Sequence, residues 1–331
     1  MRTVDIDFST LKPQRQPTLD GTFNPMLTSE ELVARNVRLR ETKNPKVSVV
    51  FVVRNEHEWI QKSVESLHSC KTNYEYECII YDDGSTDGYC SDFEVDVLMS
   101  SKNDSIGPSR ARNWCAIVAR GEFLIFCDGH LNFHDYWIDK LLEKIEEDVC
   151  DVVNPIISDI AIPTTEGYGW EFDTKSYEYK WGNRCSSFEF RGGMAGGCFA
   201  IRKDVFMRVG MFDKAFTKWG MEDSELALRL SLSGYRIGIE PSVNVGHFFK
   251  ESNEYGVDWF SYNYNFLRMA YVNMDNHGFN YVYNLINGSE SEKNNLKNAV
   301  MESSKFRKIQ VSLLQVISFK AYLEKFGREM T

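Results

Sequence analysis

The stretch Phe123-Leu-Ile-Phe-Cys-Asp-Gly-His130 changes from apolar to polar side chains within eight residues. Its first five residues predict a short buried β-strand, which is followed directly by Asp128 and His130. In open α/β sheets, ligands bind beyond the carboxyl ends of the strands. The stretch therefore predicts an α/β fold with a binding site at one edge of the sheet.

Strands and helices alternate on either side of this stretch. The run Val47-Ser-Val-Val-Phe-Val-Val53 is rich in β-branched residues and predicts a central parallel strand. Apolar residues at helical spacing follow it. The order predicts a mixed, mainly parallel sheet flanked by helices, with a helical C-terminal extension. We expect strands also over 76–81 and 235–239, and helices over 57–70, 201–210, 222–232 and much of the chain beyond 258.

Composition restricts the class of protein. The chain has 331 residues, of which 43% are hydrophobic and 26% charged, as in soluble globular proteins. Its net charge of −10 argues against a dedicated nucleic-acid binder, so no nucleic-acid partner is expected. We expect no membrane span and no signal peptide, because no apolar run is long enough. The eight cysteines include no CxxC pair, and a cytoplasmic location is expected.

Asp128 and His130 are candidate metal ligands. They flank Gly129, so in an extended chain both side chains point to the same side. A carboxylate and an imidazole together form half of a site for a divalent metal. His247, in Val-Gly-His after another predicted strand, is the candidate third ligand. The alternative is that Asp128 caps the following helix and His130 forms a local hydrogen bond.

Three further motifs each allow two interpretations. Arg112 lies at a predicted helix start, where it could face a phosphate or simply be solvated. Gly196 and Gly197 permit close approach of a ligand, but a tight turn also needs glycine. Asp83, in the segment Asp-Asp-Gly-Ser-Thr-Asp-Gly, could accept hydrogen bonds from a nucleoside or could form a turn.

The pair Glu222-Asp223 opens a predicted helix. Acidic residues favour that position because of the helix dipole alone. A carboxylate at the same place could also act as a general base toward a hydroxyl or a thiol.

Taken together, these segments resemble a known family. VSVVFVVRNE, YDDGSTD, GPSRARN, the DGH strand and WGMEDSELALR occur in the order seen in GT-A glycosyltransferases of the family-2 type. The later half is similar to the polypeptide N-acetylgalactosaminyltransferases, which have Asp-x-His, Ala-Gly-Gly, Trp-Gly-x-Glu and Val-Gly-His motifs in this order. The resemblance covers about residues 46–280 and implies a Rossmann-like GT-A fold.

The polar composition of residues 1–45, with prolines at 13, 17, 25 and 45, predicts an arm, and the resemblance implies the domain that follows it and a set of site residues. An N-terminal arm of 1–45, with a short helical stretch around 29–41, would precede a catalytic domain of 46–255 and a helical extension of 256–331. Mn²⁺ or Mg²⁺ would be held by Asp128, His130 and His247. Asp223 would deprotonate the acceptor, and Glu222 would bind the sugar or orient Asp223. The UDP-sugar donor would be bound by Arg54, Glu56, Asp83, Arg112, Asp128, Gly196, Gly197 and Trp219, with the loop 248–260 closing over it.

The implied reaction moves a hexose or N-acetylhexosamine to a Ser, Thr or Cys side chain of a peptide. Extension of a surface polysaccharide or another glycan is the alternative, and a non-catalytic sugar- or nucleotide-binding protein is the second. The retaining family has Glu-Asn where this chain has Glu222-Asp223, and this favours inversion. A nucleotidyltransferase would carry a glycine-rich loop after the first strand, where this chain has Arg54-Asn55-Glu56-His57.

We expect no membrane anchor before the catalytic segment and no lectin segment after it, which again favours a cytoplasmic enzyme. The last part of the chain, near 305–328, is amphipathic with lysines on one face. It is a candidate for peripheral membrane contact, although such a segment also suits a helix that packs on its own domain.

Overall fold

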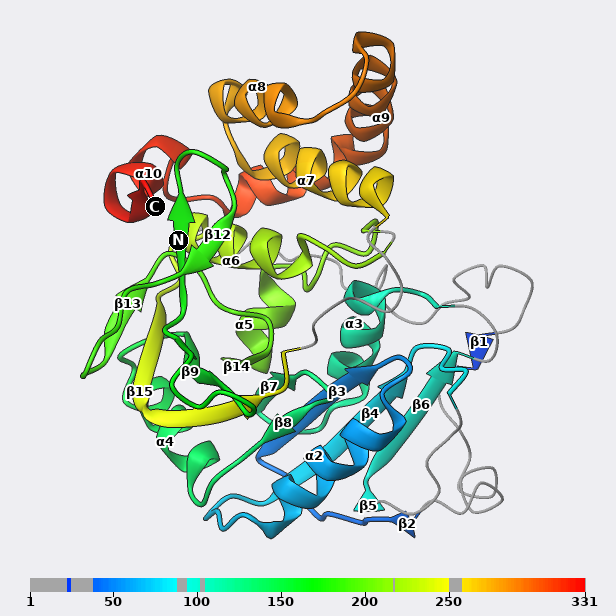
Figure 1. Cartoon of the computed structure of the whole chain (residues 1–331), viewed down its shortest axis with the longest axis vertical. Helices are drawn as coiled ribbons and strands as arrows, with labels where there is room; N and C mark the ends of the chain where they lie inside the picture. The colour runs from blue at the N-terminus through cyan, green and yellow to red at the C-terminus, as the bar shows by residue number, and fades with distance from the viewer. Residues whose placement is uncertain are drawn as a thin grey trace.

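The structure, a computed structural model, describes residues 23–24, 38–87, 94–101, 105–216, 218–249 and 258–330. Within these residues, one mixed sheet of eleven strands forms the centre of the molecule. Helices cover the sheet, and a group of C-terminal helices lies at one end (Figure 1). The two longest ladders, β3 with β4 and β9 with β15, are parallel. The predicted α/β class with a mainly parallel sheet is confirmed.

The central strands β3 (Val47–Val53) and β7 (Phe123–Cys127) have the predicted bounds, and β4 (Tyr76–Asp82) extends one residue beyond the predicted 76–81. β3 and β7 lie side by side and parallel, and β4 pairs with the other edge of β3. β14 (Cys198–Arg202) then runs antiparallel between β7 and β9 (Val152–Asp159). The carboxyl ends of β3, β4 and β7 therefore meet at one edge of the sheet.

Strand alternation divides the core into two layers. Val49 and Phe51 of β3 pack on one face, whereas Val50 between them packs on the other. Full burial of each such side chain contributes about 1.5–3 kcal/mol. The first face is covered by α2 (His57–Ser69) and α4 (Trp137–Glu146), and the second by α3 (Pro108–Val118), α5 (Lys203–Arg208) and α6 (Glu222–Leu232).

Two predicted boundaries were wrong. The helix expected over 201–210 begins only at Lys203, because β14 pairs with β7 along five residue pairs as far as Arg202. The strand expected over 235–239 is the longer β15 (Ile237–His247). Its register on β9 shifts between Glu240 and Asn244, an interval that contains Pro241, which has no N–H for the ladder. The strand resumes after this irregularity and ends at His247.

The C-terminal part is helical, as predicted, but the segment 305–328 is not one helix. α9 (Glu290–Leu314) ends before α10 (Phe319–Phe326), and the Ser318 hydroxyl caps α10 by accepting a hydrogen bond from Ala321 N at 3.1 Å. α7 (Trp259–Asn273) and α8 (Asn276–Leu285) complete the group. None of the described helices combines the length and apolar character needed to cross a membrane.

Most of the predicted N-terminal arm lies outside the described residues. Of the helical stretch predicted around 29–41, residues 29–37 lie outside them, and β2 occupies 38–39. The boundaries of the arm and of the two domains stay predictions.

The remaining strands of the described residues are short. They are β1 (Phe23–Asn24), β2 (Arg38–Leu39), β5 (Glu94–Val95), β6 (Val97–Ser101), β8 (Leu131–Asn132), β10 (Glu166–Gly167), β11 (Trp170–Asp173), β12 (Tyr179–Trp181), β13 (Glu189–Arg191) and β16 (Gly327–Arg328).

Two buried ion pairs stabilise the core, one between α7 and the sheet domain and the other within α6. Arg268 of α7 donates to both carboxylate oxygens of Asp213, at 2.8 and 3.1 Å. Arg229 donates to both oxygens of Glu225 one turn earlier in α6, and also to the carbonyls of Val209 and Met211. Removal of one partner would leave an unpaired charge in the core.

Arg229→Met should lower the free energy of unfolding by about 3–5 kcal/mol, because Glu225 would remain buried without its cation. Arg208→Met is the matched control, since Arg208 pairs with Asp204 at the same i,i+4 spacing on the exposed surface. The control should lose no more than about 0.5 kcal/mol. Urea unfolding measures both, and equal losses in the two variants would contradict the importance of the buried pair.

Candidate active site

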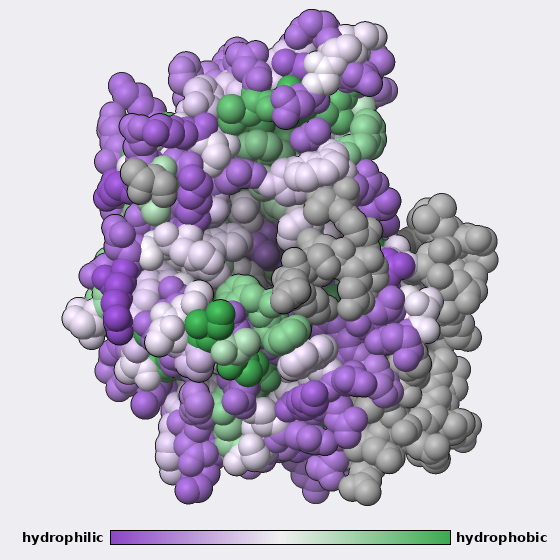
Figure 2. All heavy atoms as spheres, in the orientation of Figure 1, coloured by the Kyte–Doolittle hydropathy of each residue, from purple (hydrophilic) through white to green (hydrophobic). Residues whose placement is uncertain are grey.

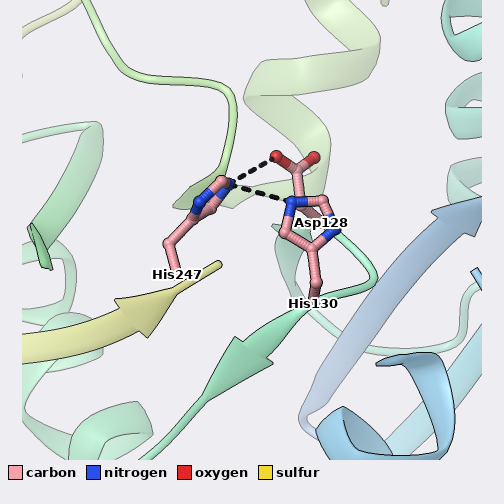
Figure 3. Close-up of side chains that lie close together, drawn as sticks. All are labelled: Asp128, His130 and His247. Atoms are coloured by element: carbon pink, nitrogen blue, oxygen red, sulfur yellow. Dashed lines mark hydrogen bonds and ion pairs between the residues drawn. The ribbon is translucent and has the colours of Figure 1, made fainter. Parts of the chain in front are cut away.

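Asp128, His130 and His247 converge at the edge of the sheet. Asp128 follows β7, His130 precedes β8, and His247 ends β15. Because β8 pairs antiparallel with β15, with Leu131 opposite His247, the two imidazoles lie side by side. His247 Nε2 is 3.2 Å from His130 Nε2 and 3.3 Å from Asp128 Oδ2. Figure 3 shows the three side chains pointing toward one another.

The geometry of this cluster fits a divalent cation. One ligand atom from each residue lies within 4.8 Å of the others. For metal–ligand bonds of about 2.1 Å, neighbouring ligand atoms are roughly 3.0 Å apart, close to the separations in the cluster. A carboxylate with two imidazoles is also a ligand set that borderline divalent metals accept. The structure thus brings the three predicted ligands together, and metal binding by them stays a prediction.

Arg112 joins this cluster to the acidic pair of α6. Its side chain is buried, so the interpretation as a solvated surface arginine was wrong. One guanidinium nitrogen donates to Asp128 Oδ1 at 3.3 Å, and the other donates to Asp223 Oδ1 at 2.9 Å. Glu222 Oε1 lies 3.6 Å from the same nitrogen as Asp223. One cation therefore faces three carboxylates.

The surroundings of Asp128 favour its ionised form. Burial alone would raise the pKa of this carboxyl. The hydrogen bond from His247 and the nearby His130 and Arg112 outweigh that effect and hold the pKa below its ordinary value. Asp128 is therefore an anion at neutral pH, as a metal ligand must be.

Glu222 and Asp223 lie in the first turn of α6 but have different environments. Glu222 is almost fully buried, and its Oε2 accepts a hydrogen bond from Gly220 N at 2.8 Å. Burial, and then the negative charge of Asp223, raise the pKa of Glu222 to about 7. The Asp223 side chain remains 19% exposed. Its pKa is raised by burial and by Asp128, with Arg112 acting in the opposite direction.

Gly196 makes room for the side chain of Asp223, and Gly197 lies beside Asp128. A Cβ on Gly196 would lie 1.8 Å from Asp223 Oδ2, so no other residue fits there while Asp223 keeps its position. A Cβ on Gly197 would lie 3.4 Å from Asp128 Oδ2. Both glycines thus line the site, and their predicted approach to the sugar stays a prediction.

Among the residues predicted to bind the nucleotide, Asp83 is buried, whereas Arg54 and Trp219 are exposed. Asp83 accepts hydrogen bonds from Ile106 N and Gly107 N, at 2.7 and 2.9 Å, and so fixes the turn before α3. Arg54 is exposed, and Trp219 is 57% exposed beside Tyr262. Binding of the donor by Asp83, Arg54 and Trp219 stays a prediction. Of the loop 248–260, residues 250–257 lie outside the described part of the chain.

Glu56 contacts the metal cluster. Its Oε2 lies 2.6 Å from His130 Nδ1, on the side of the ring opposite His247. The sequence prediction placed Glu56 in the nucleotide pocket, and its contact with His130 was missed.

Comparison with known proteins relates most of the sheet domain to glycosyltransferases. Residues 48–210 match the sequence profile of Glycosyl transferase family 2, and residues 180–252 match that of the N-terminal domain of galactosyltransferase. The chain contains a glycosyltransferase family 2 domain.

Relatives of this glycosyltransferase domain include the human polypeptide N-acetylgalactosaminyltransferase 13, which is 29% identical over 292 residues, covering 75% of this chain and 52% of that protein. The inactive polypeptide N-acetylgalactosaminyltransferase-like protein 5 of Macaca fascicularis is 27% identical over 317 residues, covering 82% of this chain and 70% of that protein. The chain spans about half the length of several such relatives.

A crystal structure of GalNAc-T7 with UDP, GalNAc and Mn²⁺ has the same fold. It superposes with a TM-score of 0.65 at 21% identity, covering 86% of this chain and 57% of that chain. At this identity the likeness concerns the fold alone, and it confirms the predicted GT-A arrangement.

One residue that fixes the candidate site was absent from the sequence prediction. Asn154 is fully buried in β9. Its amide donates to the carbonyls of Ala195 and Cys198, at 3.0 and 2.6 Å, and so fixes the turn that contains the two glycines. The only signal in the sequence is an asparagine inside the apolar run Val-Val-Asn-Pro-Ile-Ile.

His247→Ala should weaken Mn²⁺ binding by more than about tenfold, because one of three ligands is lost. Electron paramagnetic resonance of free Mn²⁺ during a titration measures the Kd without any substrate. His134→Ala is the control, since His134 is exposed and lies in the segment that follows the cluster. An unchanged Kd for His247→Ala would remove this residue from the ligand set.

Glu222 should make stability depend on pH. Its pKa is about 7 in the folded chain, above its ordinary value of 4.5. Between these two values the folded state holds the proton more tightly, so the contribution of Glu222 to stability decreases as pH rises. Glu222→Gln keeps an acceptor for Gly220 N, and its Tm relative to the wild type should rise from pH 5 to pH 8. Equal Tm differences at both pH values would contradict the raised pKa.

Proposed function

We propose that this protein is a metal-dependent glycosyltransferase that moves a hexose or N-acetylhexosamine from a UDP-sugar to an acceptor. The observation that carries the proposal is the placement of Arg112. It links the cluster of Asp128, His130 and His247 to the Glu222-Asp223 pair. A site for a diphosphate leaving group and a site for a general base would then lie on opposite sides of one buried arginine.

Asp128, His130 and His247 would hold Mn²⁺ or Mg²⁺. When bound, such a cation neutralises the charge that develops on the diphosphate, which makes UDP a better leaving group. Arg112 would add a second, permanent positive charge next to the same ligands.

Asp223 would act as the base in an inverting displacement. The acceptor oxygen or sulfur forms a bond to the anomeric carbon while the bond from that carbon to the diphosphate oxygen breaks. The electron pair of the broken bond leaves with UDP, and the proton of the acceptor moves to Asp223. Arg112 holds Oδ1 of this carboxylate, and Oδ2 is the oxygen directed toward Gly196. Glu222, in contact with the backbone of Gly220, would support the position of Asp223.

The acceptor is proposed to be a Ser, Thr or Cys side chain of a peptide, and similarity to polypeptide-modifying transferases supports it. An apolar side chain also lies beside the cluster. Phe249, which follows β15, is exposed, and the centre of its ring lies 4.3 Å from that of His247. Figure 2 shows hydrophobic surface in this part of the molecule. A glycan acceptor is the alternative.

Two further proposals concern a non-catalytic role and the location of the protein in the cell. A non-catalytic role is the second candidate, and the similarity to a relative named as inactive supports it. We also propose that the protein is cytoplasmic. Peripheral membrane contact is proposed for α9, where Phe306, Ile309 and Leu313 are exposed at helical spacing.

Release of UDP from a panel of UDP-sugars, with and without EDTA, tests the proposal. Asp223→Asn should lower transfer by at least about a hundredfold, because a general base contributes roughly 10²–10⁴ in rate. Binding of the UDP-sugar should remain within about threefold of wild type, since the variant keeps a partner for Arg112. Asp204→Asn, an exposed change, is the control. Full activity of Asp223→Asn would refute the base, and no UDP release from any donor by the wild type would favour the non-catalytic alternative.

A further inference from the structure

We infer that Glu56 is a positioning residue of the metal site, which accepts the Nδ1 proton of His130 and so presents Nε2 of that ring to the cation. The inference rests on the proposed function, because it concerns the same cluster. It assigns to Glu56 a task different from contact with the nucleotide.

The contact between Glu56 and His130 is short and shielded. Oε2 of Glu56 lies 2.6 Å from Nδ1 of His130, and the two side chains are only 13% and 11% exposed. An ionised carboxylate can only accept, so Nδ1 carries the proton in this contact. In the neutral ring the lone pair is then on Nε2, the atom that lies 3.2 Å from His247 Nε2. A carboxylate on the outer nitrogen of a metal-binding histidine fixes the tautomer and raises the basicity of the ligand.

Gly129 supplies an independent observation. A Cβ at this position would lie 2.8 Å from Glu56 Oε2 and 2.5 Å from Val53 Cγ1. The glycine between the two ligands is therefore needed because the carboxylate of Glu56 and the end of β3 fill the space beside it. The side chain of Glu56 thus packs directly against the Asp-Gly-His turn.

The backbone on both sides of His130 is held from the same helix. Ser63 of α2 is fully buried, and its hydroxyl donates to Gly129 O at 3.0 Å and accepts from Leu131 N at 2.8 Å. Glu56 directly precedes this helix. The start of α2 thus fixes the ring of His130, and the middle of α2 fixes its main chain.

Within the described residues, His247 has no matching support. Its Nδ1 is buried and has no hydrogen-bond partner there. The two imidazoles are therefore not equivalent. The support from Glu56 acts on His130 alone, so the loss of Glu56 should resemble a partial loss of that ligand.

The Kd for Mn²⁺, measured without nucleotide on the full chain, tests the inference. Glu56→Ala should raise the Kd about 10- to 100-fold. Glu56→Gln should raise it less, because the amide oxygen still accepts the Nδ1 proton although the charge is lost. Glu58→Gln is the matched control, since Glu58 is exposed in the first turn of the same helix, and it should stay within about twofold. Circular dichroism establishes that each variant is folded.

A double-mutant cycle separates positioning from general damage. In a His130→Ala background, Glu56→Ala should change the Kd by less than about twofold, because the ring on which it acts is gone. A purely structural effect would lower affinity equally in both backgrounds and would overturn the inference.

Two other results have distinct meanings. An unchanged Mn²⁺ Kd for Glu56→Ala, with weaker UDP binding at saturating Mn²⁺, would overturn the inference and favour the nucleotide pocket. A wild-type chain that binds no Mn²⁺ would refute the proposed metal site, and the assignment of Glu56 with it.

Discussion

The site depends on the position of β15 in the sheet. Its eight residue pairs with β9 continue on both sides of the register shift at Pro241, and its last residues also pair with β8. Only this double pairing places His247 opposite the Asp-Gly-His turn, although the two segments are more than 100 residues apart in the chain. The entropic cost of closing such a loop grows slowly with its length, so an extended ladder and its buried side chains are sufficient to offset it.

Charge balance explains why the cluster and the acidic pair belong together. Asp128, Glu222 and Asp223 surround the single guanidinium of Arg112 in a largely buried space. A raised pKa allows Glu222 to keep its proton up to about pH 7, which removes one negative charge. Arg112 balances a second carboxylate. A cation held by Asp128 and the two histidines would balance the third, and it would leave positive charge available for a diphosphate.

The strands of this protein could be predicted from the sequence because their signals are local. β7 is a continuous apolar run and β3 is apolar except for Ser48, and the bounds of both strands agree with the prediction to the residue. The convergence of His130 and His247 could be inferred from the strand-end positions of the motifs. The role of Glu56 could not, because it depends on how the start of α2 lies against the turn at Gly129. The full length of β15 was missed for a similar reason, since pairing with β9 overrides the interruption at Pro241.

The identity of the base is a question of access, which sequence similarity does not answer. A relative named as a transferase and a relative named as inactive match this chain to a similar degree. Burial raises the pKa of Glu222 to about 7, but this side chain is 3% exposed and its carboxyl group accepts a hydrogen bond from the backbone of Gly220. Asp223 is the more exposed residue, and its Oδ2 occupies the space that Gly196 leaves open. The next residue, Gly197, lies beside Asp128 and His247 of the metal cluster. A group that must reach an acceptor at the anomeric carbon needs that access, and for this reason the geometry favours Asp223.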